Sequence, residues 1–218
     1  MRTSLLSLVL ALAITTPALA NHKPGHPAPA PAPGKLTLAA APNPVKFGSP
    51  VTFSGKLTGN ASSGKTVQLL QDPFPFDTFT EAGSAVTDAN GDYTLTHTPT
   101  MNTRYHTRQG ATDSEIVTVL VASRIRLRVS DRTPRAGTRV RFYGRVCPEH
   151  DGASVAIRRR TAAGTWRAVT RAVLADAGVC STFSKRLRIR RDGAYRVTLS
   201  ADADHAAGRS GIRRLNVH

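Results

Sequence analysis

Hydrophobic and polar residues alternate one by one along much of the chain beyond residue 34. Between residues 138 and 147, for example, Val140, Phe142 and Val146 alternate with arginines and Tyr143. Successive side chains of a β-strand point to opposite faces, so this two-residue period predicts strands with one face buried and the other in water. The same period recurs in many short segments rich in Val, Thr and Gly, and it therefore predicts an all-β fold.

The chain contains two copies of one pattern. The stretch from Gly48 to Gly55 matches the stretch from Gly137 to Gly144 as G-x-x-V-x-F-x-G. Further matches follow in the same order: Val67 and Val155, Phe79 and Trp166, Gly91 and Gly178, Tyr105 and Tyr195, Ser114 and Ser210. A repeated order of this kind indicates two related modules. We place their boundary near Ser123, which gives modules at residues 35–122 and 123–218.

Each module contains about seven short apolar segments separated by turn residues, which is the pattern of a β-sandwich. In the second module the strands are expected at 124–130, 138–147, 153–160, 165–173, 180–190, 194–201 and 210–217. The side chains expected in the two cores are Phe53, Phe142, Trp166, Val51, Val140, Leu127 and Tyr195.

The first 34 residues have a different composition. Residues 1–20 combine Arg2, an apolar stretch at 5–14 and Ala18-Leu19-Ala20, which together predict a cleaved secretory signal. The apolar stretch is too short for a membrane-spanning helix, which needs about 20 residues. Residues 21–34 form a Pro/Ala-rich linker that favours an extended chain. We therefore expect a secreted, extracellular protein that is either released or retained non-covalently at the cell surface.

The repeated strand motif, the mid-module valine, the aromatic residue before a D-x-x-G turn and the late Tyr and Ser resemble bacterial immunoglobulin-like repeat domains. Such modules are common in exported actinobacterial proteins, and the resemblance covers residues 36–218. It implies two tandem immunoglobulin-like β-sandwiches with a role in adhesion, envelope attachment or spacing, and it carries over no catalytic residue. It also implies a tyrosine corner, in which the Tyr195 hydroxyl bonds the backbone of the preceding loop.

The chain has two cysteines, Cys147 and Cys180. An even number in an exported chain favours a disulfide, and no neighbouring Cys/His spacing resembles a zinc site. The immunoglobulin-like resemblance makes the second and fifth strands antiparallel neighbours, which implies a bridge between the end of one and the start of the other. The aligned positions in the first module are Thr58 and Tyr93, so that module lacks the bridge.

A search for catalytic motifs gives no candidate. The seven histidines are scattered, and no nucleophile turn, phosphate-binding loop or metal-ligating helix pattern occurs. We therefore expect no enzymatic activity and no cofactor. Asp88, Asn90 and Asp92 alternate as calcium ligands do, but D-A-N-G is also a hairpin turn, and the turn interpretation is favoured. A motif search cannot detect distant residues that folding brings together.

Charge differs sharply between the modules. Residues 35–123 carry six basic and seven acidic residues, whereas residues 124–218 carry twenty-two basic and seven acidic residues. A genome that favours arginine codons would enrich both modules, yet the first has only Arg104 and Arg108. The asymmetry therefore indicates a function for positive charge in the second module.

Nine arginines carry this interpretation. The resemblance places the first, second and fifth strands of the module side by side, and the arginines alternate with core residues along them. They are Arg124, Arg126, Arg128, Arg139, Arg141, Arg145, Arg186, Arg188 and Arg190. We expect them to bind an anionic polymer without sequence preference and in a salt-sensitive manner, the candidates being a cell-wall polyanion, an acidic glycan or nucleic acid. The alternatives are a structural spacer with solubilising charge and, ranked last, an enzyme.

Overall fold

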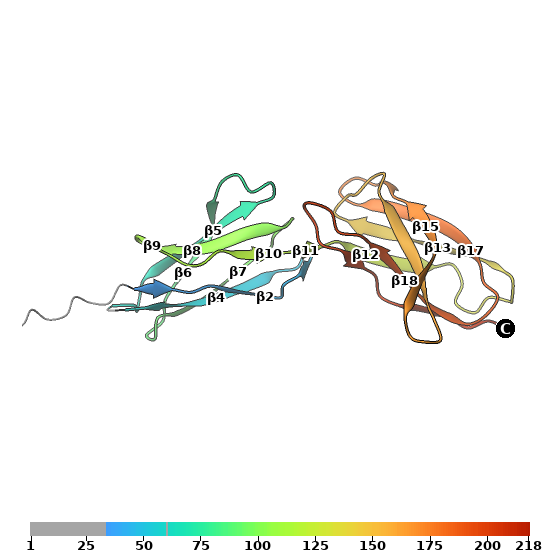
Figure 1. Ribbon diagram of the computed structural model, residues 1–218, viewed down its shortest axis with the longest axis horizontal. Coiled ribbons are helices and arrows are strands. Elements are labelled where there is room, and N and C mark those ends of the chain that lie inside the picture. Colours follow the sequence, from blue (N-terminus) through green and yellow to red (C-terminus); the bar gives the residue numbers. More distant parts are fainter. Residues whose placement is uncertain (1–33, 60) are drawn as a thin grey trace, which may run out of the picture. The chain divides into compact units, whose positions relative to one another are not determined.

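A computed structural model describes residues 34–59 and 61–218 (Figure 1). The predicted signal sequence at 1–20 and the linker at 21–34, apart from Gly34, lie outside these residues. All regular structure in the described part of the chain is β-strand, so the all-β prediction is confirmed. A search of the same residues for a helix that could cross a membrane finds none.

In the described residues before Ser123 there are eleven strands, and we call their assembly the N-terminal sandwich. They are β1 (Lys35–Leu36), β2 (Ala39–Ala41), β3 (Val45–Lys46), β4 (Val51–Thr58), β5 (Thr66–Pro73), β6 (Thr80–Val86), β7 (Asp92–His97), β8 (Thr103–Gln109), β9 (Thr112–Asp113), β10 (Val117–Val119) and β11 (Val121–Ala122). One sheet has the order β1-β4-β2 with β7 also on β4, and another has the order β10-β8-β5-β6 with β9 on β8. A parallel pair, β3 and β11, completes the assembly.

Nine strands follow Ser123, and we call their assembly the C-terminal sandwich. They are β12 (Arg124–Val129), β13 (Arg139–Cys147), β14 (Ser154–Arg160), β15 (Trp166–Val173), β16 (Ala175–Asp176), β17 (Ser181–Arg188), β18 (Gly193–Leu199), β19 (Gly208–Arg209) and β20 (Arg213–Leu215). The sheets have the orders β12-β13-β17-β16 and β15-β14-β18-β19, with β20 also on β18. The seven predicted strands coincide with β12, β13, β14, β15, β17, β18 and β20, and the short β16 and β19 are additional.

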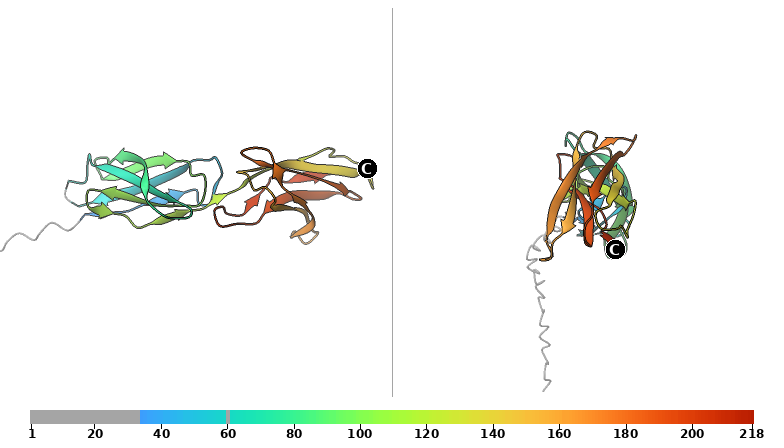
Figure 2. Two further views of the ribbon diagram at one scale, coloured as in Figure 1. Left: turned by 90° about the horizontal axis from the view of Figure 1, so that it is seen from above. Right: turned by 90° about the vertical axis from the view of Figure 1, so that its right-hand side faces the viewer.

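Figure 2 shows the strands of the C-terminal sandwich in two further views. Its two sheets share one hydrophobic core. Phe142 of β13 and Tyr195 of β18 contact each other across it, with ring centroids 5.1 Å apart. Both side chains are buried, and so are the expected core residues Val140 and Leu127. In the N-terminal sandwich, Val51 and Phe53, which correspond to Val140 and Phe142, are buried as well. No β-ladder among the described residues joins strands from the two sides of Ser123, and the module boundary itself stays a prediction.

The placement of Trp166 in the C-terminal core is wrong, because its partly buried side chain lies outside the core cluster. Its side chain is half-buried, and the guanidinium of Arg196 lies 4.2 Å from its ring centroid. The cause is a β-bulge between β14 and β15, where Ile157 pairs with Thr170 but Arg158 pairs with Ala168. One extra residue reverses the alternation, so Trp166 no longer shares a face with the buried end of its strand.

The last glycine of the repeated strand motif lies where a neighbouring strand leaves no room for a side chain. A Cβ atom on Gly144 would collide with the main-chain carbonyl of Arg126, and one on Gly55 would collide with the carbonyl of Thr37 and the ring of Tyr93. The motif therefore records the same close approach of strands in both sandwiches.

The repeated serine also has one role in both copies. Ser114 Oγ accepts a hydrogen bond from the Thr107 N–H at 2.9 Å, and Ser210 Oγ accepts one from the Val197 N–H at 2.9 Å. Each acceptor satisfies the main chain two residues after the repeated tyrosine. The late Tyr and Ser of the repeat are therefore structural positions.

The predicted tyrosine corner is not formed. Within residues 34–59 and 61–218, no main-chain hydrogen bond to the Tyr195 hydroxyl occurs, and this group instead lies beside Arg159. The Tyr105 hydroxyl bonds His97 Nδ1 at 3.0 Å. Among the described residues, neither repeated tyrosine therefore bonds the main chain of the preceding loop through its hydroxyl.

The disulfide between Cys147 and Cys180 is present, with Cα atoms 4.4 Å apart. It extends the β13–β17 ladder by one step beyond the pair Val146 and Ser181. The alignment of Cys180 with Tyr93 is wrong, because Tyr93 pairs with Gly55 whereas Phe183 pairs with Gly144. Tyr93 therefore corresponds to Phe183, and the turn before β17 is longer than its N-terminal counterpart.

Candidate polyanion-binding face

Eight of the nine predicted arginines lie on β12, β13 and β17, which are adjacent in one sheet in the predicted order. All eight are exposed, and we call their surface the arginine face: Arg124, Arg126, Arg128, Arg139, Arg141, Arg145, Arg186 and Arg188. Arg190 is exposed but follows the end of β17, so it lies beyond the ladder.

The strand register places arginines directly opposite one another. Arg126 pairs with Arg145 between β12 and β13, while Arg139 pairs with Arg188 and Arg141 with Arg186 between β13 and β17. Directly opposed residues have Cβ atoms about 4.5–5.5 Å apart, and like charges at that position are destabilising. The face therefore concentrates positive charge at some cost to the fold.

Carboxylates do not neutralise this charge. In the described part of the chain, no arginine or lysine beyond Ser123 forms a salt bridge, and the ion pairs there involve histidines. The acidic side chains serve turns and loops instead: Asp131, Asp176 and Asp192 accept main-chain N–H groups. The charge of the arginine face is thus not balanced by ion pairs among the described residues.

The N-terminal sandwich shows the opposite arrangement. Lys56 pairs with Asp92 at 3.0 Å, and Arg108 pairs with Asp113 at 2.7 Å. Asp88 Oδ1 accepts the N–H groups of Asn90 and Asp92, which is the geometry of a turn. Since the Asp88 and Asp92 carboxylates already bind donors of the chain, the arrangement supports the turn interpretation of this segment over calcium binding.

Arginines on the other sheet of the C-terminal sandwich are bound to the protein itself. Arg158 donates to the Thr198 hydroxyl at 3.0 Å, and Arg160 and Arg213 donate to the carbonyls of Gly164 and Leu127. For the eight side chains of the arginine face, one hydrogen bond to the described residues is found, a contact of 3.4 Å from the Arg145 guanidinium to the Ala177 carbonyl. The donors of the arginine face are therefore available to a ligand.

Four arginines of the face line a groove of about 770 Å³. They are Arg126, Arg128, Arg141 and Arg145, and the other lining residues are Tyr143, Gly144, Val173, Ala175, Thr182, Phe183 and Ser184. The guanidinium of Arg141 lies 4.4 Å from the centre of the Tyr143 ring. Stacking of this kind holds a guanidinium plane in one orientation while leaving its N–H groups free for bidentate bonds to an anion.

Sequence reasoning missed two features. The two-residue period puts Tyr143 on the outer face between Arg141 and Arg145, and this spacing is the signal for its contact with Arg141. A second basic depression contains Arg158, Arg196 and Arg209. Burial lowers the pKa of Arg196, and the charges of the other two arginines lower it further. This grouping depends on the register between β14 and β18, which the sequence does not display.

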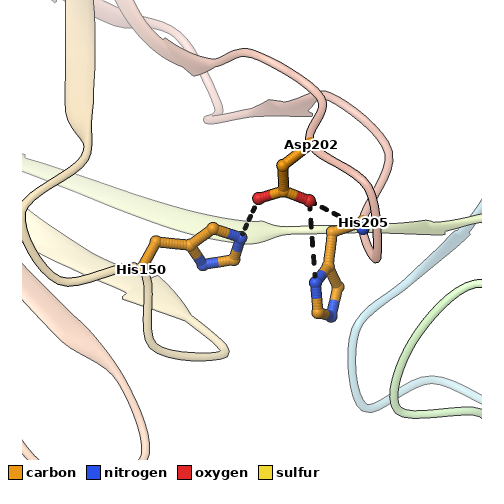
Figure 3. A group of neighbouring side chains, drawn as sticks. All are labelled: His150, Asp202 and His205. Atoms are coloured by element: carbon orange, nitrogen blue, oxygen red, sulfur yellow. Dashed lines mark hydrogen bonds and ion pairs between the residues drawn. The ribbon is translucent and has the colours of Figure 1, made fainter. Parts of the chain in front are cut away.

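Folding also brings together His150, Asp202 and His205, three residues that the motif search treated as unrelated (Figure 3). Comparisons of the chain with protein-family models and with curated proteins find no match. The proposals below therefore rest on the residues and geometry described above.

Proposed function

We propose that the protein is a secreted, non-catalytic binding protein that attaches to an anionic polymer through the arginine face of the C-terminal sandwich. The polymer carries phosphate, sulfate or carboxylate groups, as cell-wall polyanions, acidic glycans and nucleic acids do. The N-terminal sandwich, whose cations include the ion-paired Lys56 and Arg108, serves as a platform. The setting is extracellular, at or near the cell surface.

The observation that supports this most is the combination of like-charged register pairs with free donors. Directly opposed arginines repel one another, and an anion that binds both removes the repulsion and adds charge-assisted hydrogen bonds. The groove gives four of these arginines a common direction of approach. Arginine suits this role because its planar fork bonds phosphate and carboxylate bidentately.

The binding mode follows from the same geometry. Strands in one sheet are ~4.8 Å apart and same-face residues along a strand are ~6.6 Å apart, so the guanidiniums form a lattice rather than a point site. A lattice of charges binds a polymer through many weak contacts and is screened by salt, with a Debye length of about 8 Å at physiological ionic strength. We therefore expect affinity for charge density and not for a particular sequence.

The test is retention on immobilised heparin and on isolated cell-wall material. The face variant replaces Arg126, Arg141 and Arg145 by glutamine. The matched control replaces Arg167, Arg171 and Arg214, three exposed arginines outside the arginine face, so that both proteins lose the same net charge. The proposal predicts that the face variant elutes at much lower salt than the control. Equal elution of the two variants would mean that retention depends on net charge alone. That result would contradict the proposal and favour a structural spacer.

A further inference from the structure

Two buried imidazoles and one partly exposed carboxylate converge at one end of the C-terminal sandwich (Figure 3). His150 lies in the loop between β13 and β14, and Asp202 and His205 lie in the loop between β18 and β19. The side chains of His150 and His205 are 6% and 5% exposed, whereas that of Asp202 is 40% exposed, so the group is reached from solvent on the carboxylate side.

The outer nitrogen of each imidazole is committed to a main-chain carbonyl. His150 Nδ1 lies 2.9 Å from the Pro148 oxygen, and His205 Nε2 lies 2.9 Å from the Thr100 oxygen. A carbonyl oxygen only accepts hydrogen bonds, so each of these nitrogens carries a proton. In a neutral ring the other nitrogen, Nε2 of His150 or Nδ1 of His205, then presents a lone pair.

These lone pairs face carboxylate oxygens. His150 Nε2 lies 3.1 Å from Asp202 Oδ2, and His205 Nδ1 lies 3.2 Å from an oxygen of Asp204 and 4.0 Å from Asp202 Oδ1. His205 Nδ1 is buried and has no hydrogen-bond partner in the described part of the chain. His150 Nε2 also lies 3.4 Å from the Ser123 hydroxyl, whereas His205 Nδ1 faces only carboxylate oxygens at the distances given above. Acceptors that lie side by side repel one another, and a cation among them removes the repulsion. Either two protons or one metal ion supplies that charge.

The geometry favours the metal ion. Two protons would place two like-charged imidazolium rings side by side, with centroids 5.2 Å apart, whereas a single metal ion can bind both nitrogens. A metal-bound histidine, in contrast, typically donates its other N–H to a carbonyl or carboxylate, which is the arrangement found at both rings. We propose that His150, Asp202 and His205 form a binding site for a divalent transition-metal ion of the zinc class.

The choice of metal follows from the ligands. Two imidazole nitrogens and a carboxylate oxygen suit zinc and its first-row neighbours, whereas calcium and magnesium need more oxygen atoms. The three ligand atoms lie within 4.8 Å of one another. Tetrahedral zinc with bonds of about 2.0–2.1 Å separates its ligand atoms by ~3.3 Å, so small side-chain rotations complete the site. Three protein ligands leave a fourth position open to water or to Asp204.

The surrounding bonds hold the ligands in place. The His150 N–H donates to Ser181 Oγ at 2.7 Å, next to the Cys147–Cys180 disulfide. The His205 N–H donates to Asp202 Oδ1 at 2.7 Å. The site is thus anchored to β17 on one side and closed by its own loop on the other, as a preorganised metal site requires.

The experiment uses the full chain after treatment with a chelator, titrated with Zn²⁺ by calorimetry and with Co²⁺ by visible absorption. The variants are Asp202→Asn and His150→Gln, and the control is His26→Gln in the N-terminal segment. In Asp202→Asn the side-chain amide donates to the facing lone pair, so the fold is retained. Circular dichroism of the metal-free proteins checks this directly.

The proposal predicts that the parent and the control each bind one Zn²⁺ per chain. With Co²⁺, both should show the visible absorption of a four-coordinate ion. Removal of a ligand should weaken binding by at least ~100-fold, since even outer-shell changes cost 10–100-fold. Added Zn²⁺ should also raise the melting temperature of the parent and not that of Asp202→Asn. Unchanged Zn²⁺ affinity in both site variants would overturn the proposal. So would nitrogen NMR showing both rings doubly protonated at pH 7.5 with Zn²⁺ present.

Discussion

Removal of the disulfide should destabilise the C-terminal sandwich by an amount that its sequence separation sets. Replacing Cys147 and Cys180 together by alanine opens a link between residues 33 apart. In the chain-entropy relation, a closed loop of this length restricts the unfolded chain by roughly 12–13 cal/mol/K, which is about 3–4 kcal/mol at 25 °C. For a sandwich of this size the melting temperature should fall by roughly 12–30 °C.

The fold itself should survive at room temperature. Ser181 holds the neighbouring loop independently of the bridge, since its hydroxyl accepts the His150 N–H and donates to the Asp151 carboxylate. The C-terminal strands also retain their shared core. We therefore expect a folded variant with a lower unfolding midpoint rather than an unfolded chain.

Urea unfolding followed by fluorescence measures this effect in the relevant sandwich, because the chain has a single tryptophan and Trp166 lies in β15. The slope of free energy against urea should stay close to that of the parent, apart from the contribution of a less compact unfolded chain. A change below about 1 kcal/mol, or free thiols in the protein as secreted, would refute the entropic reasoning.

Three further predictions concern the cores. Phe142→Ala should cost about 3–5 kcal/mol and shift the tryptophan-monitored midpoint, because the ring is fully buried. Gly144→Ala should cost about 1–3 kcal/mol, since its Cβ meets a main-chain carbonyl, whereas the open Gly211→Ala should leave the same midpoint unchanged. Burial raises the pKa of Tyr105 to about 12, so the stability of the N-terminal sandwich should be full below pH 10 and fall as the pH rises toward 12. The Tyr105 part of the tyrosinate absorbance, taken as the difference between the parent and Tyr105→Phe, should then increase together with unfolding. Its appearance near pH 10 in the folded protein would contradict the assignment.

Strand positions could be predicted well because a strand with one buried face alternates apolar and polar residues along the sequence. The arginine face followed from the same period, since Arg124, Arg126 and Arg128 alternate with buried residues on β12. Which arginines meet across strands, and which line the groove, depends on register and twist. The sequence pattern alone does not contain that information.

Other features could not be predicted from local pattern. The bulge at Val169 reversed the orientation of Trp166, and a single extra residue leaves no signal in residue type. His150 and His205 come from loops that are far apart in the chain, so no motif spacing links them. Loops also lack the periodicity that positions a side chain on a strand.

Polyanion binding by the arginine face is best measured as the dependence of affinity on salt. The probe is a fluorescent single-stranded oligonucleotide, titrated with protein at about 50 to 300 mM NaCl. Three proteins are compared: the parent, the face variant (Arg126, Arg141 and Arg145 to glutamine) and the control (Arg167, Arg171 and Arg214 to glutamine). Each neutralised phosphate contributes about 0.7 to the slope of log affinity against log salt for a single strand. We expect the face variant to lose about 2 from the slope and the control to match the parent. Equal slopes for the two variants would contradict a dedicated binding face.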